Sequence, residues 1–326
     1  MNIALINGPG PSGSLFTREG RCTQRASIWS TQWPPITLAY LAAVAHEAGH
    51  QGRVFDCPAV GLSTEALLVK LRAQLPDICL LAISTPSYLH DMRLVEQIKA
   101  ALPVTKIGVL GVHATAMDRE VLEGCPQVDF AVRGEPEDSF AEVLAAVARG
   151  EDLSGVKGIT FRGSGGVERN PDCPYIPELD RLPFPRWSAL DLGAYRLPLG
   201  RQRFLCLSPL RGCPHKCSFC SAGSYYGRKV RYRSPESVVQ EILHCRRQYG
   251  VSDIFMWAET FTLNRRYVMK LCRAIARDAP GTRWTCNSRP DTVDPELLRE
   301  MASAGCWMIS FGLESSDPGV LERAGK

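Results

Sequence analysis

Short apolar runs alternate with longer amphipathic segments along the first 150 residues. The run at residues 78–83 is apolar at every position, which is typical of a parallel strand covered on both faces. Between such runs, apolar residues recur at helical spacing, as in Leu67, Leu68, Leu71 and Leu75. The pattern predicts strands at residues 2–6, 54–56, 78–83, 107–110 and 130–132, and helices at 37–48, 64–75, 89–102 and 139–148.

This order of elements predicts an α/β fold, with a doubly wound, Rossmann-like parallel sheet as a domain over residues 1–150. Ligands of such sheets bind outside the carboxyl ends of the strands. Residues 151–203 have a different pattern. Gly163-Ser-Gly-Gly166 lies between two short strand-like runs and predicts a hairpin. The proline-rich stretch from 171 to 198 predicts a linker between domains.

The alternation of strands and helices restarts at residue 204. Strands are predicted at residues 204–207, 254–257, 284–287 and 308–311. Ser234-Pro235 and Asp294-Pro295 have the residue types that begin helices. Four βα units resemble part of a TIM-like β/α barrel, whose active site lies at the carboxyl ends of its strands. The chain ends inside the last predicted helix, so we expect residues 204–326 to be a partial barrel truncated at its carboxyl end.

Composition restricts the class of protein. A length of 326 residues fits two domains, and the net charge of +4 does not by itself indicate nucleic acid. The 13 cysteines are odd in number and spread along the chain, which favours a reducing compartment and metal chemistry over disulfides. No signal peptide is visible, and no apolar run reaches the length of about 18 residues that a membrane span needs. We expect a cytoplasmic enzyme without a membrane span.

Cys213, Cys217 and Cys220 have the spacing C-x3-C-x2-C in a loop after a predicted strand. Three thiolates on one loop can converge on one metal centre. A closed zinc site takes four ligands, whereas a 4Fe–4S cluster held by three cysteines keeps one iron open for a substrate or cosubstrate. Two alternatives stay open: a zinc site completed by His215 or a distant residue, and three unpaired thiols that lie close by chance.

The cysteine motif, with Phe219 directly before its last cysteine, resembles that of the radical S-adenosylmethionine (SAM) enzymes. The resemblance implies that the open iron binds the amino and carboxylate groups of SAM and that Phe219 lies near the adenine. It also implies that one electron from the cluster cleaves SAM to give a 5′-deoxyadenosyl radical. A reducing partner such as flavodoxin or ferredoxin is expected to supply that electron.

Residues at the ends of the later strands also resemble sites of this family. Glu259 stands where relatives contact the SAM amino group, unless it is a solvated carboxylate. Ser288 and Arg289 follow the third strand, and an arginine there either meets a carboxylate as a bidentate fork or forms a surface ion pair. Glu314, in Gly312-Leu-Glu-Ser315, matches the stretch that binds the ribose hydroxyls, with a structural carboxylate as the alternative.

The first 150 residues resemble the cobalamin-binding domain that precedes the radical domain in one branch of this family. The matching stretches are residues 34–42, 111–115, 134–137 and 179–185. Small-residue turns after strands let a bulky ligand approach the backbone. The resemblance implies that cobalamin binds near a set of strand-end residues: Ser84, Gly111, His113, Gly134 and Glu135.

The motif D-x-H-x-x-G, which supplies the lower cobalt ligand in some relatives, is absent. Asn7-Gly-Pro-Gly-Pro-Ser12 occupies the loop in which it would stand. We therefore expect His113 to be a turn histidine that makes hydrogen bonds and not a ligand of cobalt. The same loop lacks the Gly-Lys-Ser/Thr ending of a phosphate-binding loop, so a nucleotide site is not expected there.

The resemblance implies a cobalamin-dependent enzyme that transfers a methyl group to an unactivated carbon. One alternative is radical-initiated oxidative cyclisation or rearrangement, as in the anaerobic magnesium-protoporphyrin monomethyl ester cyclase group. Others are a non-catalytic corrinoid-binding protein and a zinc-bound interaction protein. The basic run at residues 228–233 has tyrosines nearby and is more typical of a solvated face than of an RNA site, so no nucleic-acid partner is expected. A small metabolite, a lipid and a tetrapyrrole all stay open as substrates.

Overall fold

The structure, a computed structural model, describes residues 1–10, 16–19, 22–25, 32–197 and 200–326. Residues 11 and 12 of the loop after the first strand lie outside these ranges. The chain divides into two compact units, the first made of Met1–Ile176 and Pro183–Ala194, the second of Pro177–Leu182 and Tyr195–Lys326. In the described ranges, no helix has both the length and the apolar content to cross a membrane.

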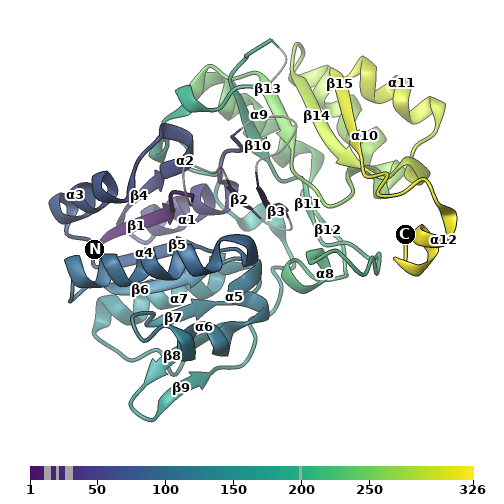
Figure 1. The fold of residues 1–326 in the computed structure, drawn as a ribbon. Coiled ribbons are helices and arrows are strands. Elements are labelled where there is room, and N and C mark those ends of the chain that lie inside the picture. The colour runs from purple at the N-terminus through teal and green to yellow at the C-terminus, as the bar shows by residue number, and fades with distance from the viewer. Residues whose placement is uncertain (11–15, 20–21, 26–31, 198–199) are drawn as a thin grey trace. The chain divides into compact units, whose positions relative to one another are not determined.

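The first unit is built on a seven-stranded sheet in the order β4-β1-β5-β6-β7-β8-β9 (Figure 1). Its strands are β1 (Asn2–Asn7), β4 (Gln51–Asp56), β5 (Ile78–Ala82), β6 (Lys106–Leu110), β7 (Phe130–Val132), β8 (Ile159–Gly163) and β9 (Gly166–Arg169). The first five are parallel, and their chain order, 2-1-3-4-5, is a doubly wound topology. The predicted sheet and hairpin are confirmed. The hairpin also extends the sheet, because β8 pairs antiparallel with β7.

Helices cover both faces of this sheet because alternate strand residues point to opposite sides. Ile3 and Leu5 share one core with side chains of α1 and α7, whereas Ala4 and Ile6 share the other with side chains of α3, α4 and α6. The first pair is α1 (Ile36–Glu47) and α7 (Pro136–Arg149), and the other three are α3 (Thr64–Gln74), α4 (Tyr88–Ala101) and α6 (Asp118–Gly124).

Several short elements of the first unit were not predicted. They are the hairpin β2 (Phe16–Glu19) and β3 (Cys22–Arg25), the helix α6, and the short helices α2 (Cys57–Val60) and α5 (Val112–Ala116). The predicted helix at 139–148 is present, but it begins three residues earlier at Pro136. Proline at the first helical position is a known start signal, so the sequence did contain this boundary.

The second unit contains four parallel strands in the order β10-β13-β14-β15, the predicted partial barrel (Figure 1). Ser234, Asn264 and Asp294 cap the three connecting helices by accepting backbone N–H groups. The elements are β10 (Phe204–Leu207), β11 (Leu210–Arg211), α8 (Ala222–Tyr225), β12 (Arg231–Tyr232), α9 (Pro235–Tyr249), β13 (Asp253–Met256), α10 (Arg265–Asp278), β14 (Arg283–Ser288), α11 (Pro295–Ser303), β15 (Cys306–Phe311) and α12 (Pro318–Arg323).

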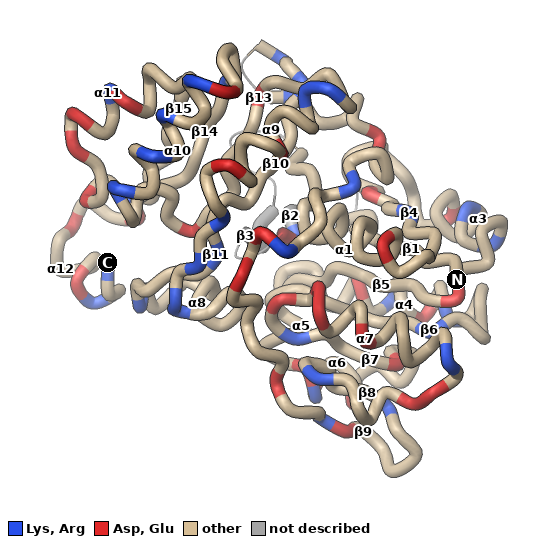
Figure 2. The backbone as a smooth tube through the Cα atoms, turned by 180° about the vertical axis from the view of Figure 1, so that it is seen from behind, with Lys and Arg blue, Asp and Glu red and all other residues tan. Residues whose placement is uncertain are grey.

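The basic run at residues 228–233 lies near β11 (Figure 2, blue). Only part of it is a solvated face. Arg228 and Lys229 are exposed, whereas Arg231 and Arg233 are buried. Arg233 forms an ion pair with Glu241, which is itself fully buried. Arg231 donates to the carbonyl of Tyr226. Two of these basic side chains therefore hold the loop, one against α9 and one against its own turn.

Candidate functional site

The cysteine loop leaves the carboxyl end of β10 through a glycine that has no room for a side chain. Gly212 has φ +97°, and a Cβ there would lie 2.4 Å from the carbonyl oxygen of Lys229. The next residue, Cys213, donates its backbone N–H to the carbonyl of Gly227 at 3.1 Å. Cys220 donates its N–H to the carbonyl of Cys217 at 3.1 Å, which brings the last two cysteines together in one turn.

The end of β13 holds the first part of this loop. Glu259 Oε2 accepts the backbone N–H of Gly212 at 3.2 Å, and Thr260 Oγ1 lies 4.0 Å from Cys213 Sγ. Glu259 is buried, so it is not the solvated carboxylate that the sequence left open. Burial raises the pKa of the Cys213 thiol. A thiolate in this position therefore needs a neighbouring cation, such as an iron ion, to stabilise it.

The end of β14 reaches the second cysteine. The guanidinium of Arg289 donates from Nε and Nη2 to Asp291 at 2.9 and 2.7 Å, and its Nη1 lies 3.9 Å from Cys217 Sγ. Arg289 therefore forms a bidentate pair with a carboxylate of this chain, and the Asp291 side chain is 56% exposed, as in the surface ion pair that the sequence left open. Only 14% of the Arg289 side chain is exposed. The hydroxyl of Ser288 accepts the N–H of Thr262 at 3.2 Å.

The segment after β15 contributes Glu314, which has φ +61°. Its Oε1 accepts a hydrogen bond from Lys326 Nζ at 2.8 Å, and the same ammonium lies 6.0 Å from the ring centroid of Phe219. Phe219 is 56% exposed. The carbonyl oxygen of Gly325 lies 3.6 Å from Cys217 Sγ, so the chain after α12 also contacts the cysteine loop.

Glu259 and Arg289 thus contact the cysteine loop directly, whereas Ser288 bonds Thr262 and Glu314 bonds Lys326. Within the described ranges, no group of three or more His, Cys, Asp or Glu side chains is arranged to hold one metal ion. A cubane has a different requirement, because each thiolate binds its own iron and the sulfurs stay apart. Cys213, Cys217 and Cys220 come from one loop, and their C-x3-C-x2-C spacing is the feature that points to a cluster of this kind.

The predicted residues of the first unit lie at the carboxyl ends of β5, β6 and β7. Gly111 has φ +114°, and a Cβ there would lie 2.6 Å from the carbonyl oxygen of Ile83. Thr115 Oγ1 donates to the carbonyl of Gly111 at 2.9 Å and accepts the N–H of Gly134 at 3.0 Å. The turns after β6 and β7 are therefore tied together at the edge where doubly wound sheets bind ligands.

His113, in the turn after β6, contacts residues that follow β5. Its Nδ1 lies 3.0 Å from Thr85 Oγ1, and its ring centroid lies 4.5 Å from that of Tyr88. Burial lowers the pKa of His113 and so favours its neutral ring. Glu135 is buried, and its Oε2 accepts the N–H of Ile176 at 2.9 Å. This carboxylate therefore ties the turn after β7 to a distant stretch of the same unit.

A buried polar network at the point between β1 and β5 was not predicted. Arg18 Nη2 forms an ion pair with Asp91 Oδ1 at 2.8 Å, and its Nη1 donates to Asn7 Oδ1 at 2.9 Å. Asp91 Oδ2 accepts from Ser87 Oγ at 2.6 Å, and Ser87 Oγ lies 2.7 Å from Ser84 Oγ. The chain turns in opposite directions on either side of this point, which makes it the topological switch point. Asn7 at a strand end was a signal for it, whereas Arg18 had none.

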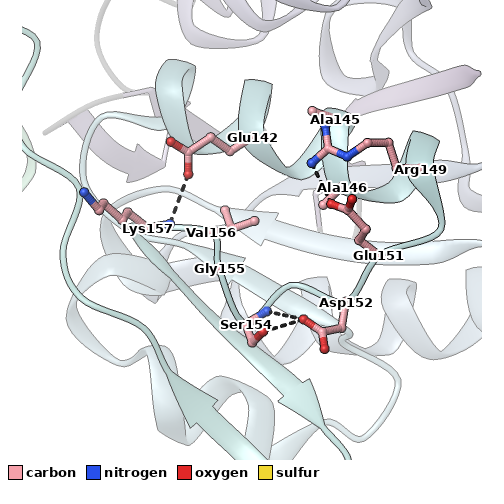
Figure 3. A pocket seen from close by; sticks show the side chains of 10 residues that line it. All are labelled: Glu142, Ala145, Ala146, Arg149, Glu151, Asp152, Ser154, Gly155, Val156 and Lys157. Atoms are coloured by element: carbon pink, nitrogen blue, oxygen red, sulfur yellow. Dashed lines mark hydrogen bonds and ion pairs between the residues drawn. The ribbon is translucent and has the colours of Figure 1, made fainter.

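The cavity drawn in Figure 3 lies elsewhere in the first unit. It has a volume of about 700 Å³ and is lined by the last turns of α7 and by residues 151–157. Arg149 pairs with Glu151 at 2.6 Å, and Asp152 accepts from the N–H of Ser154 at 2.9 Å. Its lining runs from the second half of α7 to Lys157, which stands next to Gly158, and the carbonyl of Gly158 accepts the N–H of Arg133 directly after β7. The lining contains none of the predicted site residues.

Comparison with known proteins adds two family matches. Residues 29–144 match the B12 binding domain, and residues 207–326 match the radical SAM superfamily. The chain is 31% identical over 303 residues to an uncharacterized methyltransferase of Pyrococcus horikoshii, a match that covers 92% of this chain and 64% of the relative. It is 35% identical over 297 residues to the anaerobic magnesium-protoporphyrin IX monomethyl ester cyclase of Cereibacter sphaeroides, covering 87% of this chain and 47% of the relative. The chain therefore spans about half to two thirds of these relatives.

A solved structure has the same fold. The radical SAM methyltransferase TsrM from Kitasatospora setae, determined with cobalamin and a [4Fe–4S] cluster bound, superimposes with a TM-score of 0.74. The two sequences are 18% identical, and the match covers 100% of this chain and 62% of TsrM. The chain belongs to the radical SAM superfamily through residues 207–326 and has a B12-binding domain at residues 29–144.

Proposed function

We propose that this protein is a cobalamin-dependent radical SAM enzyme that transfers a methyl group to an unactivated carbon. The observation that carries the proposal is the attachment of one cysteine loop to two neighbouring strand ends. Glu259 accepts the N–H of the residue that precedes Cys213, and Arg289 reaches Cys217. A loop that is fixed in this way holds its metal-binding side chains in position, as a reactive metal centre requires.

The residues present fit the three cofactors. Cys213, Cys217 and Cys220 would hold the 4Fe–4S cluster, because they stand on one loop within the residues that match the radical SAM superfamily. When bound, the reduced cluster supplies the electron that cleaves SAM to a 5′-deoxyadenosyl radical, and cobalamin supplies the methyl group. Phe219 and Glu314 would contact the adenosine part of SAM, since both lie beside the cysteine loop.

The other strand-end residues would position the cofactors and exclude water. Glu259 and Ser288 have their side chains engaged at the ends of β13 and β14, so they would shape the SAM pocket. In the first unit, the positive-φ turns at Gly111 and Gly134 would line the edge of the sheet at which the corrin ring binds. His113 would contact the cofactor from the turn after β6, where its Nδ1 lies 3.0 Å from Thr85 Oγ1.

The test is anaerobic purification, reconstitution and quantification of iron, sulfide and cobalt. The protein is then incubated with a chemical reductant and SAM that is labelled in its methyl group. A cubane, bound cobalt and formation of 5′-deoxyadenosine support the proposal. Cobalt binding with an intact cluster and no deoxyadenosine indicates a corrinoid-binding protein instead. Stoichiometric zinc without a cubane overturns the proposal.

A second candidate is radical-initiated cyclisation, favoured by the 35% identity to a cyclase. Product analysis with a tetrapyrrole, a lipid and a small-metabolite substrate separates the two activities. A labelled methyl group in the product supports methyl transfer, whereas deoxyadenosine with no label in the product supports cyclisation or rearrangement. Both activities need a one-electron donor of the flavodoxin or ferredoxin kind and a reducing compartment such as the cytoplasm.

A further inference from the structure

Arg289 is held so that one of its nitrogens points to a cysteine sulfur. Nε and Nη2 donate to the two oxygens of Asp291 at 2.9 and 2.7 Å, which fixes the plane of the guanidinium. Nη1 then lies 3.9 Å from Cys217 Sγ. The Arg289 side chain is only 14% exposed, so its contact with Cys217 is largely shielded from solvent. This contact joins the end of β14 to the cysteine loop across 72 residues of chain.

A cation beside a cluster ligand changes how easily the cluster takes up an electron. Reduction adds one negative charge to a centre that is already surrounded by three thiolates. A nearby positive charge and a hydrogen bond to sulfur both favour that reduced form, and they are among the factors that set cluster potentials. A nearby carboxylate has the opposite effect. The positive charge of Arg289 and the negative charge of Asp291 are therefore expected to shift the reduction potential of the cluster in opposite directions.

We propose that Arg289, held by Asp291, is a positioning residue that raises the reduction potential of the cluster by donating a hydrogen bond to Cys217. This inference rests on the proposed function, since it requires that Cys217 is a cluster ligand. It gives Arg289 the role of contacting a cysteine ligand of the cluster. Nε and Nη2 of its guanidinium are engaged by Asp291, which leaves Nη1 to face Cys217.

The experiment is a redox titration of the reconstituted protein without SAM, followed by electron paramagnetic resonance of the reduced cluster. In Arg289→Gln we expect the ratio of reduced to oxidised cluster at a fixed potential to fall about tenfold, which is about 59 mV for a one-electron couple. In Asp291→Asn the negative charge beside the Arg289 guanidinium is removed. We therefore expect the ratio of reduced to oxidised cluster at the same potential to rise. Arg289→Lys keeps the positive charge but cannot form the bidentate pair. Its reduction potential is expected to lie between those of Arg289→Gln and the unmodified protein.

The matched control is Arg277→Gln. Arg277 donates from Nε and Nη2 to Asp278 at 2.8 and 2.6 Å, the same bidentate pairing. It lies at the end of α10, at the amino edge of the strands, and is 71% exposed. Its replacement is expected to leave the potential unchanged.

Opposite shifts in Arg289→Gln and Asp291→Asn support the inference, and either shift alone in its expected direction supports it if the other variant fails to hold a cluster. Unchanged potentials in both variants overturn it while leaving the proposed function intact. An effect of Arg289→Gln that appears only when SAM is added also overturns it and assigns the residue to the cosubstrate carboxylate. Failure of the unmodified protein to form a cubane overturns both proposals.

Discussion

Glu259 accepts the backbone N–H of Gly212 at 3.2 Å, which ties the carboxyl end of β13 to the residue before Cys213. Hydrogen bonds to a charged group contribute about 1.5–3 kcal/mol. We expect Glu259→Ala to loosen the loop and to lower the iron and sulfide retained per chain after desalting. Glu259→Gln keeps an acceptor oxygen and is expected to retain most of the iron. Equal iron in the Glu259→Ala and unmodified proteins would show that this bond does not support the cluster.

The three cysteines of the loop are expected to be individually essential for the cluster. Replacement of Cys213, Cys217 or Cys220 by Ala removes one corner ligand, and we expect the visible iron–sulfur absorption to be lost or greatly reduced. Cys306→Ala is the control, because Cys306 begins β15 and so lies at the opposite end of the strands. It is expected to keep full absorption. A cubane that persists in all three loop variants would contradict the assignment of its ligands.

Gly111 is expected to tolerate no side chain. Its φ of +114° is outside the range that other residues adopt with ease, and a Cβ would lie 2.6 Å from a carbonyl oxygen. We expect Gly111→Ala to lower the free energy of unfolding by about 1–3 kcal/mol, measured by urea denaturation followed by circular dichroism. A methyl group at Gly155 would meet no atom within 4 Å, so Gly155→Ala is the control with little or no loss. Equal stability of the two variants would contradict the steric argument.

Asp172 is expected to make stability depend on pH in the acid range. The Arg133 guanidinium, which donates to Asp172 at 2.8 Å, holds the pKa of that carboxyl below its usual value. Its contribution is present above the unfolded-state pKa of about 4 and is lost as pH falls through the lower folded pKa. The difference in free energy of unfolding between the unmodified protein and Asp172→Asn should be under about 1 kcal/mol at pH 6, because the side chain is mostly exposed.

The check is urea denaturation of both proteins at several pH values between about 3 and 6, a range that includes the pKa of an aspartate in an unfolded chain. The difference should shrink toward the acid end. A difference that stays constant across the range would mean that the carboxylate charge of Asp172 is not what stabilises the fold.

The main elements could be predicted because their signals are local. Apolar runs such as β5, which is buried at all positions, identify strands covered on both faces. A serine or aspartate before a helix, with proline next, identifies helix starts such as that of α9. Once strands are placed, the edge that carries chemistry follows from topology. This is why Cys213, Arg289 and Gly111 could be assigned to strand ends from the sequence alone.

The contacts that hold the site could not be predicted, because their partners are far apart in sequence. Arg18 and Asp91 are separated by 73 positions, and Gly212 and Glu259 by 47. Single polar residues carry no periodic pattern that would pair them. The helices α5 and α6 were missed because they are short. They are 5 and 7 residues long, which is too few for apolar periodicity to stand out from a loop.

The lack of space for a side chain at Gly212 affects which mutations a genetic screen should recover. The backbone carbonyl of Lys229 occupies the place of its missing side chain, so even the smallest substitution would displace the strand pairing between β11 and β12. A random mutagenesis screen for lost activity should therefore recover changes at this codon as readily as at the codons of the three thiols. Such hits would mark a residue that supplies no atom to the reaction, only the space through which the chain must pass.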